Sequence, residues 1–285
     1  MKGLAARDAF WLGGLLLGAI ALLGSSLDGL PLRDWDEATV AQVAREIWQA
    51  PAGSQRWLFP TLWDEPYFNK PPLVHNAIAW TYQLWGDREG AARLPGAVCT
   101  GLSVLCLYGI GRELFPRRQT AFFGAALYLT ALPVVRHGRL AMLDGAVLCF
   151  ATLACWCLLR ARRDLRWSLG AGLAWGLLCL TKGVALGGLF GAIALGFLAW
   201  DTPRLLASPF WWGGMILGSV PAWGWYWVQS AHAAERFVRT ALLQQNFSRI
   251  WTAVDLNSGP PWYYLDKLLQ ALPGLPIFWA GIGLA

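Results

Sequence analysis

The sequence contains few charged residues, and those present fall in short clusters. Lys, Arg, Asp and Glu make up 14% of the 285 residues, whereas hydrophobic residues make up 56%. The clusters separate apolar runs, and a run of about 20 apolar residues can span the hydrocarbon core of a membrane. No alternating strand pattern is present, and backbone in lipid must be hydrogen-bonded within its own segment. The sequence therefore predicts an all-α fold, a polytopic transmembrane helix bundle.

Metal-ligand and disulfide patterns are also missing. The six cysteines lie inside apolar runs without the spacing of a metal site, which favours a packing role. The three histidines, His75, His137 and His232, have no ligand spacing either, so packing or interfacial roles are expected. The net charge of +6 does not indicate a nucleic-acid partner, because the basic residues are distributed between apolar runs rather than gathered on one face.

One amphipathic stretch, 71–86, decides the topology. If it crossed the membrane, the basic loops 112–118 and 160–166 would lie outside, although Lys and Arg collect on the cytoplasmic side. We therefore place 71–86 in the membrane interface and the N-terminus in the cytoplasm. The predicted membrane helices are then the apolar runs near 9–27, 94–111, 119–135, 140–159, 167–181, 184–200, 208–229 and 268–285.

The outer side of the membrane then receives a first loop, 28–93, the turn at 136–144 and a second loop, 230–266. The first loop is predicted to hold two interfacial helices, 37–50 and 71–86, because apolar residues recur at helical spacing on one face of each. A further interfacial helix is expected within the second loop, at 232–249.

Two adjacent carboxylates, Asp36 and Glu37, follow the first apolar run and are the candidate catalytic residues. A carboxylate held at the membrane surface could act as general base for an acceptor hydroxyl or amine. The alternative is that Asp36 caps the following helix and Glu37 favours its first turn.

Other ionisable residues are predicted to share that side. Lys70 precedes Pro71-Pro72 and is either a phosphate ligand or a lysine that contacts lipid headgroups. Asp144 and Lys182 lie at the ends of apolar runs, where ionisable residues indicate a functional site or an ion pair that staples helices. Arg136, Arg139 and Arg249 add cations. We expect Asp144 to be catalytic and the donor phosphate to be bound by Lys70, Lys182, Arg139 and Arg249.

Several segments resemble the motifs of a known family, in its order and spacing. They are Asp36–Glu46, Tyr67–Pro71, Ala141–Asp144, Leu180–Gly183 and Pro261–Tyr264. The family is that of the polyprenyl-phosphate-sugar dependent glycosyltransferases with the GT-C fold. The resemblance points in particular to the bacterial branch that contains lipid A aminoarabinose transferases and relatives of protein O-mannosyltransferases.

The resemblance implies a bacterial inner-membrane enzyme that transfers a sugar, with inversion, from a polyprenyl-phosphate donor. The acceptor would be a lipid, a glycan or a protein on the periplasmic face. Asp36 would be the catalytic carboxylate, Lys70 the lysine that contacts the donor phosphate, and Asp144 the second acidic position. Asn69 and Tyr263 stand in the matching segments, Asn246 stands in the second outer loop, and all three are expected to line the site.

The sequence departs from the aminoarabinose branch at a metal site. There a Glu precedes the lysine and a Glu-His pair occupies the second outer loop, whereas this chain has Asn69 and Gln245-Asn246. A metal site of that kind is therefore not expected, and aminoarabinose or lipid A is not indicated. A divalent ion bound through oxygen by Asp36, Glu37 or Asp144 stays an alternative.

The family's later helices and C-terminal outer domain have no counterpart in residues 1–285, which we interpret as a single transmembrane catalytic domain. Two other hypotheses remain. One is a membrane transporter or lipid flippase, because buried carboxylates and lysines also line transport paths. The other is a non-catalytic membrane fragment. Charges crowded at one face, without an internal repeat, favour the enzyme.

Overall fold

The computed structural model describes residues 2–33, 35–248, 260, 262 and 263. It is mostly helical, as the sequence predicts. The elements in chain order are α1 (Lys2–Gly24), α2 (Asp36–Trp48), β1 (Thr61–Leu62), β2 (Glu65–Pro66), α3 (Leu73–Trp85), α4 (Glu89–Leu114), α5 (Arg118–Thr130), α6 (Leu132–His137), α7 (Asp144–Ala161), α8 (Trp167–Lys182), α9 (Val184–Asp201), η1 (Pro203–Leu205), α10 (Pro209–Phe237) and η2 (Val238–Ser248).

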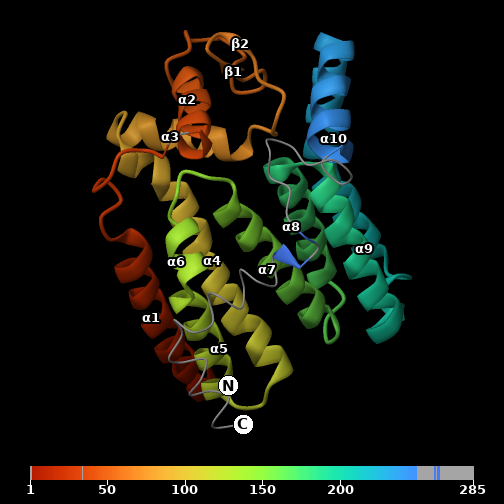
Figure 1. Ribbon diagram of the computed structural model, residues 1–285. Helices are drawn as coiled ribbons and strands as arrows, with labels where there is room; N and C mark the ends of the chain where they lie inside the picture. The colour runs from red at the N-terminus through yellow and green to blue at the C-terminus, as the bar shows by residue number, and fades with distance from the viewer. Residues whose placement is uncertain (1, 34, 249–259, 261, 264–285) are drawn as a thin grey trace.

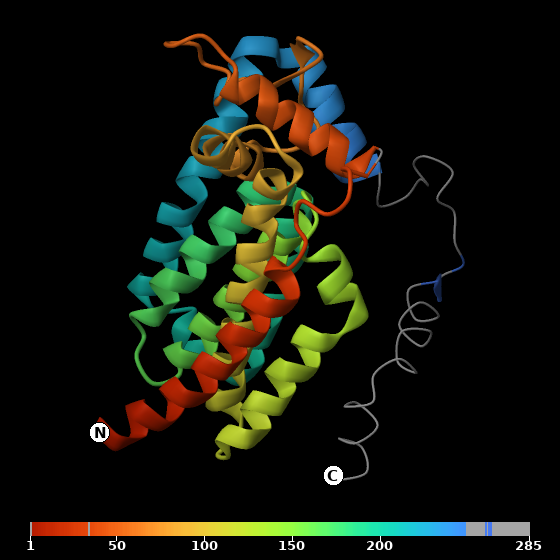
Figure 2. The ribbon, with the colours of Figure 1, turned by 90° about the vertical axis from the view of Figure 1, so that its left-hand side faces the viewer.

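The long helices run side by side along one axis, and α2, β1, β2 and α3 cover one end of the bundle, here called the capped end (Figure 1). The N-terminus lies at the opposite end, as Figure 2 shows from the side. Among the described helices, α4, α7 and α9 are long and apolar enough to cross a membrane, and α1 contributes a shorter apolar stretch, Asp8–Gly24. The chain is therefore an integral membrane protein with several candidate spans.

The structure differs from the predicted runs where local chemistry interrupts a helix. The run 119–135 is split at Ala131, whose extended backbone (φ −61°, ψ 124°) ends α5 before Pro133 enters α6. The last predicted span, 268–285, lies outside the described residues. The two-residue strands β1 and β2 pair antiparallel and were not predicted, since such short strands leave no periodic pattern.

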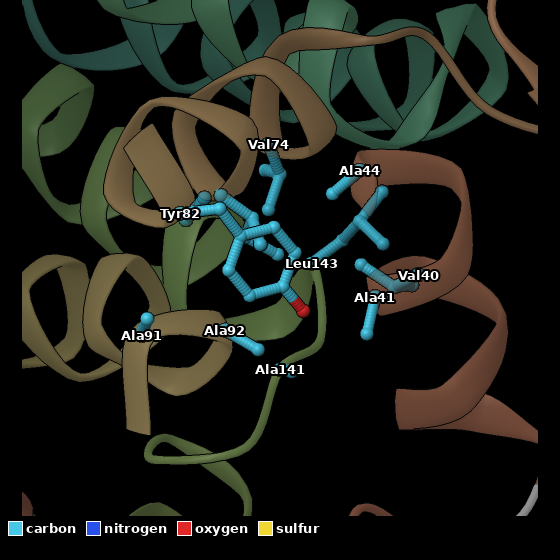
Figure 3. Packing of buried hydrophobic residues seen from close by; sticks show 11 residues of the cluster. Val40, Ala41, Ala44, Val74, Tyr82, Ala91, Ala92, Ala141 and Leu143 are labelled. Atoms are coloured by element: carbon cyan, nitrogen blue, oxygen red, sulfur yellow. The ribbon is translucent and has the colours of Figure 1, made fainter. Parts of the chain in front are cut away.

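The amphipathic stretch 71–86 forms α3, whose 13 residues rise only about 20 Å at 1.5 Å per residue. It lies across the capped end rather than along the bundle (Figure 1). A buried cluster fixes it there and contains Val40, Ala41 and Ala44 of α2, Val74 and Tyr82 of α3, Ala91 and Ala92 of α4, and Ala141 and Leu143 before α7 (Figure 3). This cluster attaches the start of α2 to the membrane helices.

Close packing of α8 against α10 aligns the other half of the bundle. A Cβ atom added to Gly176 would overlap the backbone of Gly218, and one added to Gly172 would overlap that of Gly214. The glycines stand one helical turn apart on each helix, a spacing that lets two membrane helices approach closely. The close approach determines where the ends of α8 and α10 lie at the capped end.

We expect Gly176→Val to disrupt this contact and to lower the free energy of unfolding by about 1–3 kcal/mol, because the added side chain would overpack the helix interface. Thermal unfolding in detergent would measure the change. Gly188→Val is the matched control, because no atom lies within 4 Å of a Cβ at that position of α9. Equal effects of the two substitutions would contradict the role of the α8–α10 contact.

Candidate functional site

A cavity of about 240 Å³ opens at the capped end between segments that are far apart in the sequence. Its walls come from the start of α2, the segment before α3, the start of α7, the end of α8 and η2. The lining residues are Trp35, Asp36, Thr39, Val40, Tyr67, Asn69, Lys70, Met142, Leu143, Asp144, Lys182 and Gln245. The cavity, called here the acidic–basic pocket, combines two carboxylates with two lysines.

Five of the predicted site residues therefore meet in one place. Asp36, Asp144, Lys70, Lys182 and Asn69 all line the acidic–basic pocket. Apart from the neighbours Asn69 and Lys70, these residues come from separate parts of the sequence, each at the end of an apolar run or within a different motif. Such a set of charges at one end of the bundle could bind a phosphate and exchange a proton next to it.

Glu37 does not line the pocket, although it was predicted to be catalytic beside Asp36. Successive side chains on a helix point about 100° apart, and Glu37 faces the bundle, where it is fully buried. Its carboxylate accepts hydrogen bonds from Arg93 Nε at 2.9 Å and Nη2 at 3.0 Å. It also accepts from the backbone N–H of Ala141 at 2.8 Å and of Arg33 at 3.0 Å. The geometry gives Glu37 a structural role.

Arg93 uses all of its donors in the same network. Besides Glu37, its guanidinium donates to the carbonyls of Leu27, Leu30 and Pro31. Burial would raise the pKa of Glu37, but the hydrogen bonds from Arg93 and from two backbone N–H groups outweigh it and lower this pKa. The pair ties the end of α1, the start of α2 and the turn before α7 to α4.

Asp144 and Lys182 form the ion pair that the sequence allowed, with Lys182 Nζ 2.7 Å from Asp144 Oδ1. Asp144 stands in the first turn of α7 and Lys182 in the last turn of α8, where each charge is favoured by its helix dipole. Both side chains are more than one third exposed. An exposed pair adds little stability, so exchanging it for contacts with a ligand would cost little free energy.

The segment that carries Lys70 is held from two sides. Phe68 packs edge-on against Phe237 of α10, with ring centroids 5.6 Å apart. The Leu58 carbonyl accepts hydrogen bonds from Trp225 Nε1 and Gln229 Nε2 of the same helix. On the other side, Tyr67 contacts His75 edge-on at 5.4 Å. The predicted packing role of His75 is thus confirmed.

The start of α2 carries backbone strain beside the pocket. Trp35 has a positive φ of 68°, which a bulky residue rarely adopts. Its side chain is 80% exposed and lines the pocket next to Asp36. Strain of this kind persists where surrounding contacts fix the chain, and it is common at functional sites.

Other predicted residues are placed differently. Arg139 lines a second cavity and not the acidic–basic pocket. Tyr263 is exposed and is not among the described residues that line the pocket. Asn246 belongs to η2, but its side chain is not described, and Arg249 lies outside the described residues.

Sequence reasoning did not select Trp35, Thr39, Tyr67, Met142 and Gln245, which also line the pocket. Thr39 could have been found, since it stands three residues after Asp36 and shares its helix face. Gln245 could also have been found, since it precedes the predicted site residue Asn246 and stands where the aminoarabinose branch has its Glu-His pair.

The pocket has a limited set of metal ligands. Within the described part of the chain, no group of three or more His, Cys, Asp or Glu side chains converges. A metal ion here would have Asp36 and Asp144 as its carboxylates, and Asp144 is already paired with Lys182.

We expect Arg93→Met to lower the free energy of unfolding by about 3–5 kcal/mol, because it leaves the buried Glu37 carboxylate without a counter-charge. Thermal unfolding of the purified protein would measure this loss. Arg45→Met is the matched control, since the ion pair of Arg45 with Asp87 is about one third exposed and should contribute less than about 1 kcal/mol. Similar losses in the two variants would contradict the anchoring role of Arg93.

His75 should make stability depend on pH. Burial lowers its pKa from 6.5 to about 4, although the Pro71 carbonyl favours the protonated ring. The contribution of neutral His75 to the free energy of unfolding is complete above pH 6.5. It decreases as the pH drops towards 4, because in this range the ring takes up a proton in the unfolded chain and not in the folded chain.

At about 1.4 kcal/mol per pH unit, the loss by pH 5 should be about 2 kcal/mol. Thermal unfolding at pH 7 and pH 5 should show a smaller difference for His75→Gln than for the wild type. His137→Gln, at an exposed position, should keep the wild-type difference. An unchanged pH dependence in His75→Gln would contradict the assignment.

Comparison with known proteins agrees with this architecture. The family model described as "Dolichyl-phosphate-mannose-protein mannosyltransferase" matches residues 69–227. The crystal structure of ArnT from Cupriavidus metallidurans bound to undecaprenyl phosphate superposes with a TM-score of 0.77 at 24% identity, and covers 95% of this chain and 50% of that chain. The fold is thus the GT-C fold of ArnT.

Two curated relatives carry the description "undecaprenyl phosphate-alpha-4-amino-4-deoxy-L-arabinose arabinosyl transferase". The protein of Shewanella sediminis is 30% identical over 84% of this chain and 44% of its own length. The second transferase of Pseudomonas fluorescens strain Pf-5 is 29% identical over 87% of this chain and 42% of its own length. The chain therefore spans less than half of these relatives. With more than half of its residues matched by the family model, the chain belongs to the dolichyl-phosphate-mannose-protein mannosyltransferase family.

Proposed function

We propose that this chain carries the donor site and the catalytic carboxylate of a glycosyltransferase that uses a polyprenyl-phosphate sugar. The observation that carries the proposal is the acidic–basic pocket, in which Asp36 and Asp144 face the same space as Lys70 and Lys182. An undecaprenyl-type donor is supported by the relatives, whose descriptions name undecaprenyl phosphate. The acceptor is a lipid, a glycan or a protein.

In the proposed reaction, Asp36 accepts the proton of the acceptor hydroxyl or amine. The acceptor atom forms a bond to the anomeric carbon while the bond from that carbon to the phosphate oxygen breaks. The polyprenyl phosphate leaves with the electron pair, and the lysine charges stabilise its developing negative charge. Attack from the side opposite the phosphate inverts the configuration at the anomeric carbon.

The other pocket residues take supporting roles in this proposal. Asp144 holds Lys182 at 2.7 Å and so positions one cation for the phosphate. Lys70 supplies the second cation from the segment packed against α10. Asn69 and Gln245 offer uncharged polar groups to the hydroxyls of the sugar.

We propose that the capped end faces the periplasm and the N-terminus the cytoplasm. The opposite end of the bundle carries the basic loops before α5 and before α8, with Arg117, Arg118, Arg162, Arg163 and Arg166, which agrees with the positive-inside rule. The pocket then lies at the level where the headgroup of an outer-leaflet lipid meets water.

A transporter or lipid flippase is the alternative function. Charged groups of a transport path would be expected near the middle of the membrane helices. Here the carboxylates and lysines of the pocket stand at helix ends, Asp144 in the first turn of α7 and Lys182 in the last turn of α8. This placement favours the transferase.

Asp36→Asn should reduce transfer at least 100-fold, because it keeps the shape of the side chain and removes the proton acceptor. The assay follows release of polyprenyl phosphate from a small panel of radiolabelled polyprenyl-phosphate sugars by the purified protein in lipid vesicles. Asp64→Asn is the matched control, since its carboxylate lies at the same end of the bundle outside the pocket. It should keep wild-type release.

Wild-type rates in Asp36→Asn would remove Asp36 from the mechanism. Absence of release with every donor, from wild-type protein shown to be folded, would contradict the transferase and favour a transport function. Flux of the same labelled lipids across the vesicle membrane would then be measured.

A further inference from the structure

A second cavity lies at the capped end and has a different character. Its volume is about 180 Å³, and it shares no described lining residue with the acidic–basic pocket. Its walls come from the segment after α1, from α4, from α6 and from the turn after α6. Four of its lining residues are arginines, namely Arg33, Arg93, Arg136 and Arg139. We call it the arginine pocket.

Three of these arginines can bind a ligand. Arg93 cannot, because its N–H groups are used by Glu37 and three backbone carbonyls. Within the described residues, the side chains of Arg33, Arg136 and Arg139 form no ion pair, and no acidic residue is among those that line the cavity. The cavity therefore presents an excess of positive charge.

Apart from Ser26, the other described residues that line the arginine pocket are apolar. Leu30 and Leu132 line it and are 66% and 60% exposed, and Val135 also lines it. Large exposed leucines next to arginines fit a molecule with an anionic head and an apolar body. In both views, α6 stands near the end of α1 that is closer to the capped end, below α2 and α3 (Figures 1 and 2).

We propose that the arginine pocket binds the phosphate group of an anionic membrane lipid, separately from the donor phosphate. Arg136 and Arg139 hold the phosphate through charge-assisted hydrogen bonds, for which the guanidinium fork is well suited. Leu30 and Leu132 contact the first carbons of the lipid. Dissolved inorganic phosphate could make the same hydrogen bonds to the arginines, but it would make no contact with the apolar side chains of the cavity.

The Glu37–Arg93 pair removes one arginine from the charge of the arginine pocket. The Glu37 carboxylate neutralises the buried Arg93, whereas Arg33, Arg136 and Arg139 line the same cavity without an ion pair among the described residues. The two cavities share no described lining residue. A lipid phosphate at Arg136 and Arg139 would therefore occupy the outer leaflet beside the donor without competing for Lys70 and Lys182.

The test compares lipid retention by the wild-type protein and by the double variant R136Q/R139Q. Purified protein in detergent is titrated with phosphatidylglycerol or phosphatidylcholine, and bound lipids are counted by native mass spectrometry. We expect the wild type to bind phosphatidylglycerol more tightly than phosphatidylcholine, and the double variant to lose about tenfold or more in affinity for phosphatidylglycerol only.

The matched control is R117Q/R166Q, which removes the same charge from exposed positions at the opposite end of the bundle. It should retain phosphatidylglycerol as the wild type does. Arg136 is exposed, so R136Q alone serves as a second variant with no buried contact to lose, and thermal unfolding checks that each variant is folded.

Three outcomes would overturn the proposal. They are unchanged retention in R136Q/R139Q, an equal loss in R117Q/R166Q, and displacement of phosphatidylglycerol by millimolar inorganic phosphate, which would make the site one for a dissolved anion. The measurement detects binding and not transfer. Its result therefore stands independently of whether the protein releases polyprenyl phosphate from a sugar donor.

Discussion

The arrangement of the capped end depends on the buried ion pair between Glu37 and Arg93. A buried ion pair is stabilising only when the remaining donors and acceptors of both groups are also hydrogen-bonded. Here both oxygens of Glu37 accept hydrogen bonds, and the guanidinium of Arg93 donates to them. The backbone groups that complete the network come from the segment between α1 and α2 and from the turn before α7. The pair therefore fixes Asp36 by its neighbour Glu37, and brings the turn that leads to Asp144 close to it.

The opposite wall of the acidic–basic pocket is set by helix packing. The glycine contact between α8 and α10 determines where Lys182 and the upper part of α10 lie. Phe237 at the end of α10 packs against Phe68, close in sequence to Lys70, and the chain continues into η2, which supplies Gln245. One wall is thus held by a polar network and the other by close backbone and aromatic packing, and the Asp144–Lys182 ion pair joins α7 to α8 at the pocket.

The sequence predicts the class of fold and much of the acidic–basic pocket, because both depend on local features. Apolar runs give the helices, and the positive-inside rule puts Asp36, Lys70, Asp144 and Lys182 on one side of the membrane. The role of Glu37 was also readable in part, since it lies at helical spacing from Val40 and Ala44 on the apolar face of α2. Its partner was not, because Arg93 is 56 residues away and no pattern links the two. The separation of Arg139 from Lys70 likewise follows from tertiary packing alone.

Cations that lie on the same side of a membrane do not necessarily bind the same phosphate, as the placement of the arginines shows. Arg139 and Lys70 both lie at the capped end, yet they line different cavities. The acidic–basic pocket balances its two lysines with two carboxylates, which suits a reaction in which a proton moves and a phosphate leaves. The arginine pocket has no described carboxylate in its lining and has exposed leucines beside its charges, which suits retention of an anion rather than chemistry on it. In the two proposals made above, separate charge balance in the two cavities would let one membrane protein hold a structural lipid in one cavity and a reacting lipid in the other.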